Sequence, residues 1–305
     1  MTEGVARRLR AALLVALWTA AGGVGVLMIG LDISRLDGLM VDNRMVPPDL
    51  LARLGRIAGG DDVLIGRDFI NVWTAGHIVA DGRPELLYDV EAYRAYQQAL
   101  VGHDLDAHNY SYPPLSLPLT APFGLLAYPL ALALWLIGTG VLFVHAARPW
   151  MREARLPAIL VLLLPASLLN IWTGHYGFIV GALWLYGWRA LERAPTRAGV
   201  ALGLIALKPH LGVLLPIVLA LRGQWRSFAA AAAIVLGLIL LSLALFGPSL
   251  WSDYLSRTTG EQARMIDAGA AFFGAMSTSP ATAVLALGAG ESVALVAQAL
   301  IAAVA

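Results

Sequence analysis

Residues 157–188 read PAILVLLLPASLLNIWTGHYGFIVGALWLYGW, an apolar stretch whose centre is the polar sequence NIWTGH, residues 170–175. One interpretation is a single long helix with polar residues in its middle. The other is a pair of short helices that meet at a polar turn. Each would have about 11 to 15 residues, too few to cross a bilayer core comfortably. Residues 198–221 are likewise apolar except for a polar centre, LKPH, at residues 207–210.

The composition of the whole chain places these stretches in a membrane. Of the 305 residues, 59% are hydrophobic and 13% are charged, and the mean hydropathy is +0.72; soluble domains carry roughly 25% charged residues. The sequence contains no cysteine, which excludes a disulfide framework and a thiolate metal site. We therefore predict an all-α polytopic membrane protein of about eight membrane helices. The apolar runs lie at 11–31, 115–147, 156–171, 175–188, 198–207, 210–221, 227–246 and 291–305.

The arginine residues predict the orientation of the chain in the membrane. They cluster before the first apolar run and in three later links, at Arg7, Arg8, Arg10, Arg148, Arg152, Arg155, Arg189, Arg193, Arg197, Arg222 and Arg226. If alternate links are cytoplasmic, all four clusters fall on one side, as the positive-inside rule requires. This predicts a cytoplasmic N-terminus and polar turns at 170–175 and 208–210 that face outward. The charge pattern thus favours two pairs of short helices.

The outward-facing side also receives the longest polar segments. Irregular polar backbone at membrane depth is tolerated only where protein buries it or where it lines a wet cavity. We therefore predict an outward-facing chamber. The two turns form its bottom, and the first outer segment covers it. The predicted division of a single integral membrane domain, 1–305, is a signal anchor at 1–31, an outer catalytic loop at 32–112, membrane helices at 113–246, a second outer loop at 247–290 and a last, truncated helix at 291–305.

Two amphipathic helices are predicted in the first outer loop. From Phe69 to Val79, apolar residues recur at three- and four-residue spacing, which predicts a helix that lies along the membrane surface. A second helix is predicted at about 89–101, with Asp89 as its N-cap. Pro113 and Pro114 end the loop before the next apolar run.

Asp68 stands at the start of the first of these helices and has two interpretations. Aspartate is a favoured N-cap, although Asn71 occupies the position where a capping box would have glutamate or glutamine. A carboxylate at the membrane face is also able to accept a proton as a general base. The residues alone leave both interpretations open.

Lys208 is the only lysine in the chain, and it stands beside Pro209 and His210 in apolar surroundings. It is either a side chain that snorkels to the interface or a cation that binds a phosphate or another anionic group. His175 and His210 occupy matching positions in the two polar turns. Each is either a satisfied polar residue or a contact to substrate.

Several functional classes find no support in the sequence. There is no Walker motif, no GxSxG elbow and no GxGxxG between strand and helix, and the six histidines lack metal-ligand spacing. We therefore expect no metal and no cofactor. We also expect no nucleic-acid partner, because membrane topology explains the arginines. Tyr110 and Tyr112, just before the prolines, are typical of interface anchors.

The combination of segments resembles a known family. The outer loop reads RDFINVWTAGHIVADGRPELLYD (67–89), and SYPPLSLPLTAPF (111–123) leads into the next apolar run; NIWTGHYG (170–177), GLIALKPHLGVLLP (203–216) and the basic RGQWR (222–226) follow. Over about residues 66–280 this resembles glycosyltransferase family 87, formerly a family of unknown function. That family contains polyprenyl-phosphate-mannose-dependent α-mannosyltransferases of the GT-C superfamily.

The resemblance implies a GT-C-like bundle and a reaction at the outer face of the cell membrane. A polyprenyl-phosphate sugar is the donor, and a glycolipid or glycan, in contact with membrane lipid, supplies the acceptor hydroxyl. Asp68 would deprotonate that hydroxyl, which attacks the anomeric carbon with inversion. The leaving phosphate needs electrostatic stabilisation. The expected substrate-binding residues are Lys208, His210, Tyr112, Asn170, His175 and His77.

Two features depart from the family. The turn expected to read Gly-Gln is Gly174-His175 here, and family members are usually longer than this chain. Two alternatives therefore remain: a transporter or flippase of lipid-linked sugars, and a non-catalytic, diverged member. Transporters often carry inverted repeats, and the sequence has no recognisable repeat, which argues against the first alternative.

Overall fold

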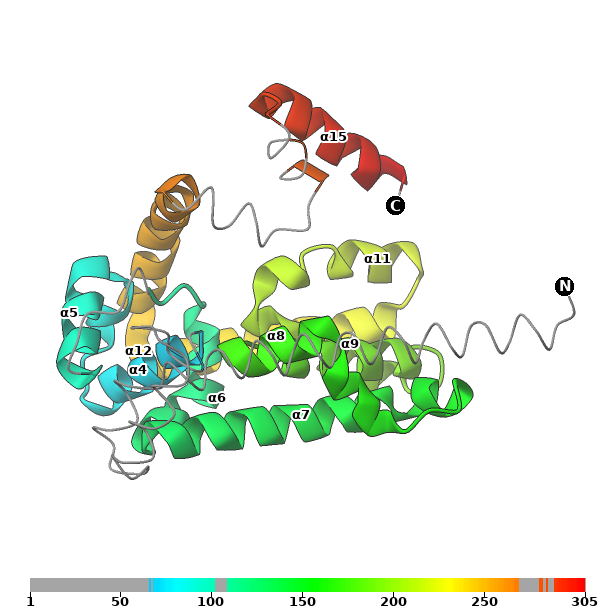
Figure 1. Ribbon diagram of the computed structural model, residues 1–305, viewed down its shortest axis with the longest axis horizontal. Coiled ribbons are helices and arrows are strands. Elements are labelled where there is room, and N and C mark those ends of the chain that lie inside the picture. Colours follow the sequence, from blue (N-terminus) through cyan, green and yellow to red (C-terminus); the bar gives the residue numbers. More distant parts are fainter. Residues whose placement is uncertain are drawn as a thin grey trace, which may run out of the picture. The chain divides into compact units, whose positions relative to one another are not determined.

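The structure is a computed structural model that describes residues 66, 68–101, 109–268, 280–281, 284 and 288–304. The described residues form helices and turns and contain no strand (Figure 1), so the prediction of an all-α chain is confirmed. The expected signal anchor at 1–31 and residues 32–65 lie outside the described residues.

The chain runs through helices of very different length. The α-helices are α4 (Phe69–Ala80), α5 (Val90–Val101), α6 (Leu117–Thr120), α7 (Tyr128–Glu153), α8 (Pro165–Thr173), α9 (Gly177–Ala190), α10 (Pro195–Gly203), α11 (Leu215–Leu221), α12 (Trp225–Ala268) and α15 (Glu291–Val304). Short 3₁₀ turns connect them: η1 (Pro84–Tyr88), η2 (Pro114–Ser116), η3 (Ala121–Leu125), η4 (Ala158–Leu163), η5 (Leu204–Leu207) and η6 (Pro209–Leu211).

In the part of the chain that the structure describes, two helices are long and apolar enough to cross a membrane. They are α7 and the part of α12 from Trp225 to Thr258. Both carry exposed apolar side chains, such as Ile137 (65% exposed) on α7 and Leu240 (65%) on α12, as a surface that faces lipid would. The other apolar runs among the described residues form helices too short to pass the same test, so the bundle of eight membrane helices stays a prediction.

The two apolar stretches with polar centres are each a pair of short helices, as predicted. In the first, α8 and α9 meet at residues 174–176; in the second, α10 with η5 is followed by η6 and α11, with Lys208 between the two 3₁₀ turns. α9 packs between α7 and α10 (Figure 1). The Ser227 hydroxyl donates a hydrogen bond of 2.9 Å to the Pro195 carbonyl and joins α12 to α10.

Contacts divide the chain into two compact units, Met1–Trp251 and Ser252–Ala305. The first holds α4 to α11 and the beginning of α12, and the second holds the end of α12 and α15. The segment predicted as the second outer loop begins at a break in α12 at Gly247 (φ 78°, ψ 169°), beyond which the helix continues to Ala268. Glycine adopts this conformation without steric cost, and Pro248 follows it.

The helix predicted at 69–79 is α4, and protein covers most of its residues; its place along the membrane surface stays a prediction. Phe69, Ile70 and Ala75 are fully buried, although they point in different directions around the helix. The Gly76 and Gly124 backbones pack so closely that a Cβ atom on Gly76 would lie 2.4 Å from the Ala121 carbonyl oxygen. Neighbouring segments of the protein, rather than lipid, therefore cover the apolar face of this helix.

The second helix predicted in this segment is α5, and its N-cap is confirmed. The Ala92 backbone N–H donates to Asp89 Oδ1 at 3.1 Å, the bond an N-cap aspartate makes to the third helical residue. The Tyr93 hydroxyl donates to Asn71 Oδ1 at 2.9 Å, which ties α5 to α4. Buried polar groups of both helices thus satisfy one another.

Candidate functional site

The segment that enters α4 is held by the end of α8. The Gly66 N–H donates to the Trp172 carbonyl at 3.0 Å, and the Asp68 N–H donates to the Thr173 carbonyl at 2.8 Å. The last carbonyls of a helix have no partner within that helix. Here two of them bind a distant segment, so the C-terminus of α8 determines where Asp68 stands.

Gly174 makes this junction possible. It follows α8 in the left-handed conformation (φ 67°, ψ 24°), and its N–H donates to the Asn170 carbonyl, the usual way in which a glycine ends a helix. A Cβ atom at this position would lie 2.6 Å from the Phe69 Cβ and 3.2 Å from the Gly66 Cα. Only glycine allows the turn and the start of α4 to approach this closely.

The side chain of Asp68 does not cap α4. Asp68 occupies the N-cap position, but its carboxylate makes no capping hydrogen bond to the helix. Instead Oδ2 lies 4.0 Å from Nε2 of His175, and 36% of the side chain is exposed. The capping interpretation is therefore wrong for the carboxylate.

Nε2 of His175 lies near both the carboxylate of Asp68 and the amine of Lys208. The Lys208 Nζ contacts Nε2 of the His175 ring and lies 3.4 Å from Nδ1. The His175 side chain is 30% exposed, and Lys208 is half-buried. The three residues come from the start of α4 and from both polar turns, so the structure brings together segments that are far apart in the sequence.

The charges in this cluster follow from burial and from neighbouring groups. Both turns lie outside the two helices long enough to span a membrane. Burial, and then Lys208 and His210, lower the pKa of His175 to about 3, so the ring is neutral at pH 7. Burial lowers the pKa of Lys208 to about 8, against the opposing effect of Asp68. At pH 7 the cluster therefore holds a cationic amine and a neutral imidazole beside a carboxylate.

Tyr112 belongs to an aromatic floor under this cluster. Its side chain is 9% exposed, and its ring lies 4.5 Å from that of Tyr176; Tyr176 in turn packs 5.1 Å from Trp135. Tyr110 is buried too, with its hydroxyl 2.9 Å from that of Ser116. The interpretation of Tyr110 and Tyr112 as interface anchors is thus wrong. Burial raises the pKa of Tyr112, and the charge of the Asp68 carboxylate raises it further.

His210 lies near the cluster, Asn170 is buried against Gly177, and His77 lies further along α4. His210 is exposed and close enough to lower the pKa of His175. Asn170 is 6% exposed, and its Oδ1 packs against Gly177, where a Cβ atom would come within 2.4 Å of it. His77 lies nine residues after Asp68 on α4, about 13 Å along the axis, and its ring packs 4.4 Å from Trp73.

The sequence analysis missed Tyr176 and the carbonyl groups of α8. Tyr176 is 1% exposed and is central to the aromatic floor; its position directly after His175 was the available signal. The role of the Trp172 and Thr173 carbonyls has no sequence signal, because backbone atoms carry none. Within the described ranges, no group of three potential ligand side chains is close enough to hold a metal ion.

Comparison with known proteins identifies one family. The family model of glycosyltransferase family 87 matches residues 110–305. That range contains Tyr112, His175, Lys208 and His210, and it begins after Asp68. No curated protein and no solved structure matches the sequence.

Proposed function

The chain belongs to glycosyltransferase family 87, whose match covers more than half of its length, and from this we propose that it transfers mannose from a polyprenyl-phosphate sugar to an acceptor hydroxyl. The chain is a glycosyltransferase and so uses a donor and an acceptor. The proposal adds their identity: a lipid-linked sugar, and a hydroxyl of a glycolipid or glycan. We also propose that the protein is an eight-helix bundle in the cell membrane and that its active site lies on the outer face.

One observation carries the proposal. The Asp68 carboxylate makes no capping bond to α4 and lies 4.0 Å from His175, whose ring contacts the only lysine of the chain. A carboxylate and a cation therefore both lie near Nε2 of one neutral ring. Transfer from a sugar phosphate requires both, because a proton must leave the attacking group and negative charge develops on the departing one.

The reaction proceeds as a single displacement. The acceptor O–H gives its proton to the Asp68 carboxylate while its oxygen forms a bond to the anomeric carbon. The bond between that carbon and the phosphate oxygen breaks, and the polyprenyl phosphate leaves with the electron pair. Because the acceptor attacks the face opposite to the phosphate, the configuration at the anomeric carbon inverts.

Lys208 stabilises the leaving phosphate. Its amine is half-buried, so water screens its charge less than at the surface. Contact with His175 holds the amine in place, and the neutral ring does not compete for the phosphate. The exposed ring of His210, on the same turn, offers a further hydrogen-bond donor to the phosphate oxygens.

An apolar hollow supports a lipid-linked donor. It has a volume of about 530 Å³ and runs along α7, where its lining includes Leu136, Gly140 and Val144, and across to Ile171 and Phe178. Ile171 directly precedes Trp172, whose carbonyl holds the segment of Asp68. An isoprenoid chain in this hollow would bury apolar surface with its phosphate end near the polar turns.

Substitution of Asp68 by asparagine tests the proposal. We expect transfer from polyprenyl-phosphate-mannose, by purified protein in nanodiscs, to fall by about 100-fold or more because the base is lost. The fold should persist, since the carboxylate caps nothing and asparagine also suits the N-cap position. Asp89→Asn is the matched control, because its cap on α5 survives the change. Equal transfer by wild type and Asp68→Asn would remove Asp68 from the mechanism.

A further inference from the structure

A second hollow lies at the other end of α9 from His175. Its volume is about 460 Å³, and its lining consists of Glu153, Trp188, Arg189, Leu191, Glu192, Arg193, Arg222 and Gln224. α9 begins just after His175 and ends at Ala190, which separates the two sites by about 20 Å. The hollow is therefore independent of the cluster around Asp68.

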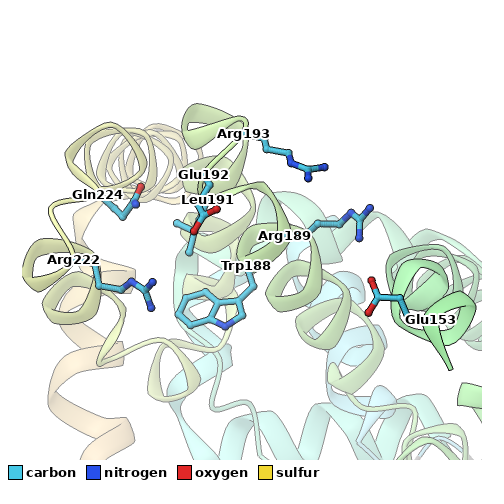
Figure 2. A pocket seen from close by; sticks show the side chains of 8 residues that line it. All are labelled: Glu153, Trp188, Arg189, Leu191, Glu192, Arg193, Arg222 and Gln224. Carbon is cyan, nitrogen blue, oxygen red and sulfur yellow. The ribbon is translucent and has the colours of Figure 1, made fainter.

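The hollow is formed where several helices end. Glu153 is the last residue of α7, Trp188 and Arg189 lie in the last turn of α9, and Arg222 follows α11. Figure 2 shows Arg222 directed toward the indole of Trp188, whereas Arg189, on the same helix as Trp188, extends away from Arg222 on the side of Glu153. Cationic side chains at helix C-termini interact favourably with the helix dipole. This interaction does not use the N–H donors of the guanidinium groups, which remain able to bind a ligand.

None of the three guanidinium groups pairs with a carboxylate of a described residue. Among the described residues, the structure records no ion pair for Arg189, Arg193 or Arg222, although Glu153 and Glu192 also line the hollow. The lining thus keeps an excess of one positive charge and several free donors. Guanidinium groups bind phosphate through paired N–H donors.

Exposed tryptophans, which are typical of a membrane–water interface, gather at this end of the helices. Trp150 near the end of α7 is 38% exposed, Trp188 of α9 is 46% exposed, and Trp225 at the start of α12 is 62% exposed. Tryptophan is enriched at the level of the lipid headgroups. Arg189 additionally lies over the Trp150 ring, 5.8 Å from its centroid.

We propose that this hollow binds the phosphodiester headgroup of a membrane phospholipid. The arginines hold the phosphate, and the tryptophans hold this end of the helices at headgroup depth. A basic pocket between membrane helices is suited to an anionic headgroup. A free phosphate ion would use the same donors, but the tryptophans favour a ligand that belongs to the bilayer.

Native mass spectrometry of the purified chain with phosphatidylglycerol tests the proposal. The site variant is Arg189→Gln/Arg193→Gln/Arg222→Gln. The matched control is Arg152→Gln/Arg197→Gln/Arg226→Gln, which removes the same charge from residues that do not line the hollow. We expect wild type and control to retain one tightly bound lipid and the site variant to bind it about 100-fold more weakly. Diacylglycerol, which has no phosphate, should not compete.

Three outcomes would overturn the proposal. The first is equal lipid binding by the site variant and wild type, and the second is equal loss in both triple variants. The third is displacement of the lipid by millimolar inorganic phosphate, which would assign the hollow to the free ion. Thermal unfolding of each variant checks that the fold is intact. The readout is binding, so the result does not depend on whether Asp68 is the catalytic base.

Discussion

The backbone N–H of Asp68 donates a hydrogen bond of 2.8 Å to the carbonyl oxygen of Thr173, and this bond joins the start of α4 to the end of α8. The acceptor is one of the carbonyls that a helix leaves without an internal partner. The bond fixes the backbone of Asp68 next to the turn that carries His175. The position of the proposed base therefore depends on how α8 ends.

Substitution of Gly174 by alanine should disturb this junction. The left-handed backbone alone would cost about 1–2 kcal/mol, and the new Cβ would lie 2.6 Å from the Phe69 Cβ. We expect a lower melting temperature and a drop in transfer of about 100-fold, because small displacements of catalytic groups are costly. Gly138→Ala is the control: its Cβ would meet no atom within 4 Å, so its melting temperature should not fall. A Gly174→Ala protein with wild-type stability and transfer would contradict this account.

Transfer should decline as the pH rises through about 8. The pKa of Lys208 is lowered to about 8, so the amine is charged below that pH and loses its charge above it. The proposed stabilisation of the leaving phosphate then disappears. In Lys208→Arg the charge persists to far higher pH, and the decline should move to higher pH, whereas Lys208→Met should be inactive at every pH. A decline near pH 8 that survives in Lys208→Arg would assign it to another group.

Substitution of His175 by glutamine should be tolerated. The lowered pKa keeps the imidazole neutral at pH 7, and the glutamine amide is also neutral and offers an acceptor to Lys208. We expect Gln at this position to retain transfer within about ten-fold, whereas His175→Ala leaves the lysine without this partner and should lose about ten-fold or more. Comparison of kcat in the two variants makes the distinction. Equal loss in both would mean that the ring has a function beyond hydrogen bonding.

Substitution of Asp89 by alanine should lower stability without changing the chemistry. Asp89 accepts a hydrogen bond from the Ala92 N–H at the start of α5, and loss of an N-cap typically costs about 1 kcal/mol. Asp89→Asn retains a capping oxygen and should change stability by only a few tenths of that amount. Thermal unfolding and transfer are measured together for both variants. A large loss of transfer in Asp89→Asn would give this residue a role beyond capping.

Local sequence patterns predicted much of the secondary structure. The polar centres of residues 157–188 and 198–221 correctly indicated two pairs of short helices, and Asp89 correctly indicated the start of α5. These features depend on residues close together in the chain, such as glycine, proline and capping side chains. The eight-helix membrane bundle remains a prediction.

The sequence by itself determined that the chain is helical and rich in apolar segments, and it singled out Asp68, His175 and Lys208 as chemical groups of interest. Only the tertiary structure decided that these three meet, that Asp68 leaves its helix uncapped and that α4 is buried within the protein. Periodicity reports that a face is apolar, but lipid and protein satisfy an apolar face equally well. Likewise, packing and backbone hydrogen bonds, such as that from Asp68 to Thr173, determine the distance between side chains on remote segments. No pattern of side chains in the sequence encodes these backbone bonds.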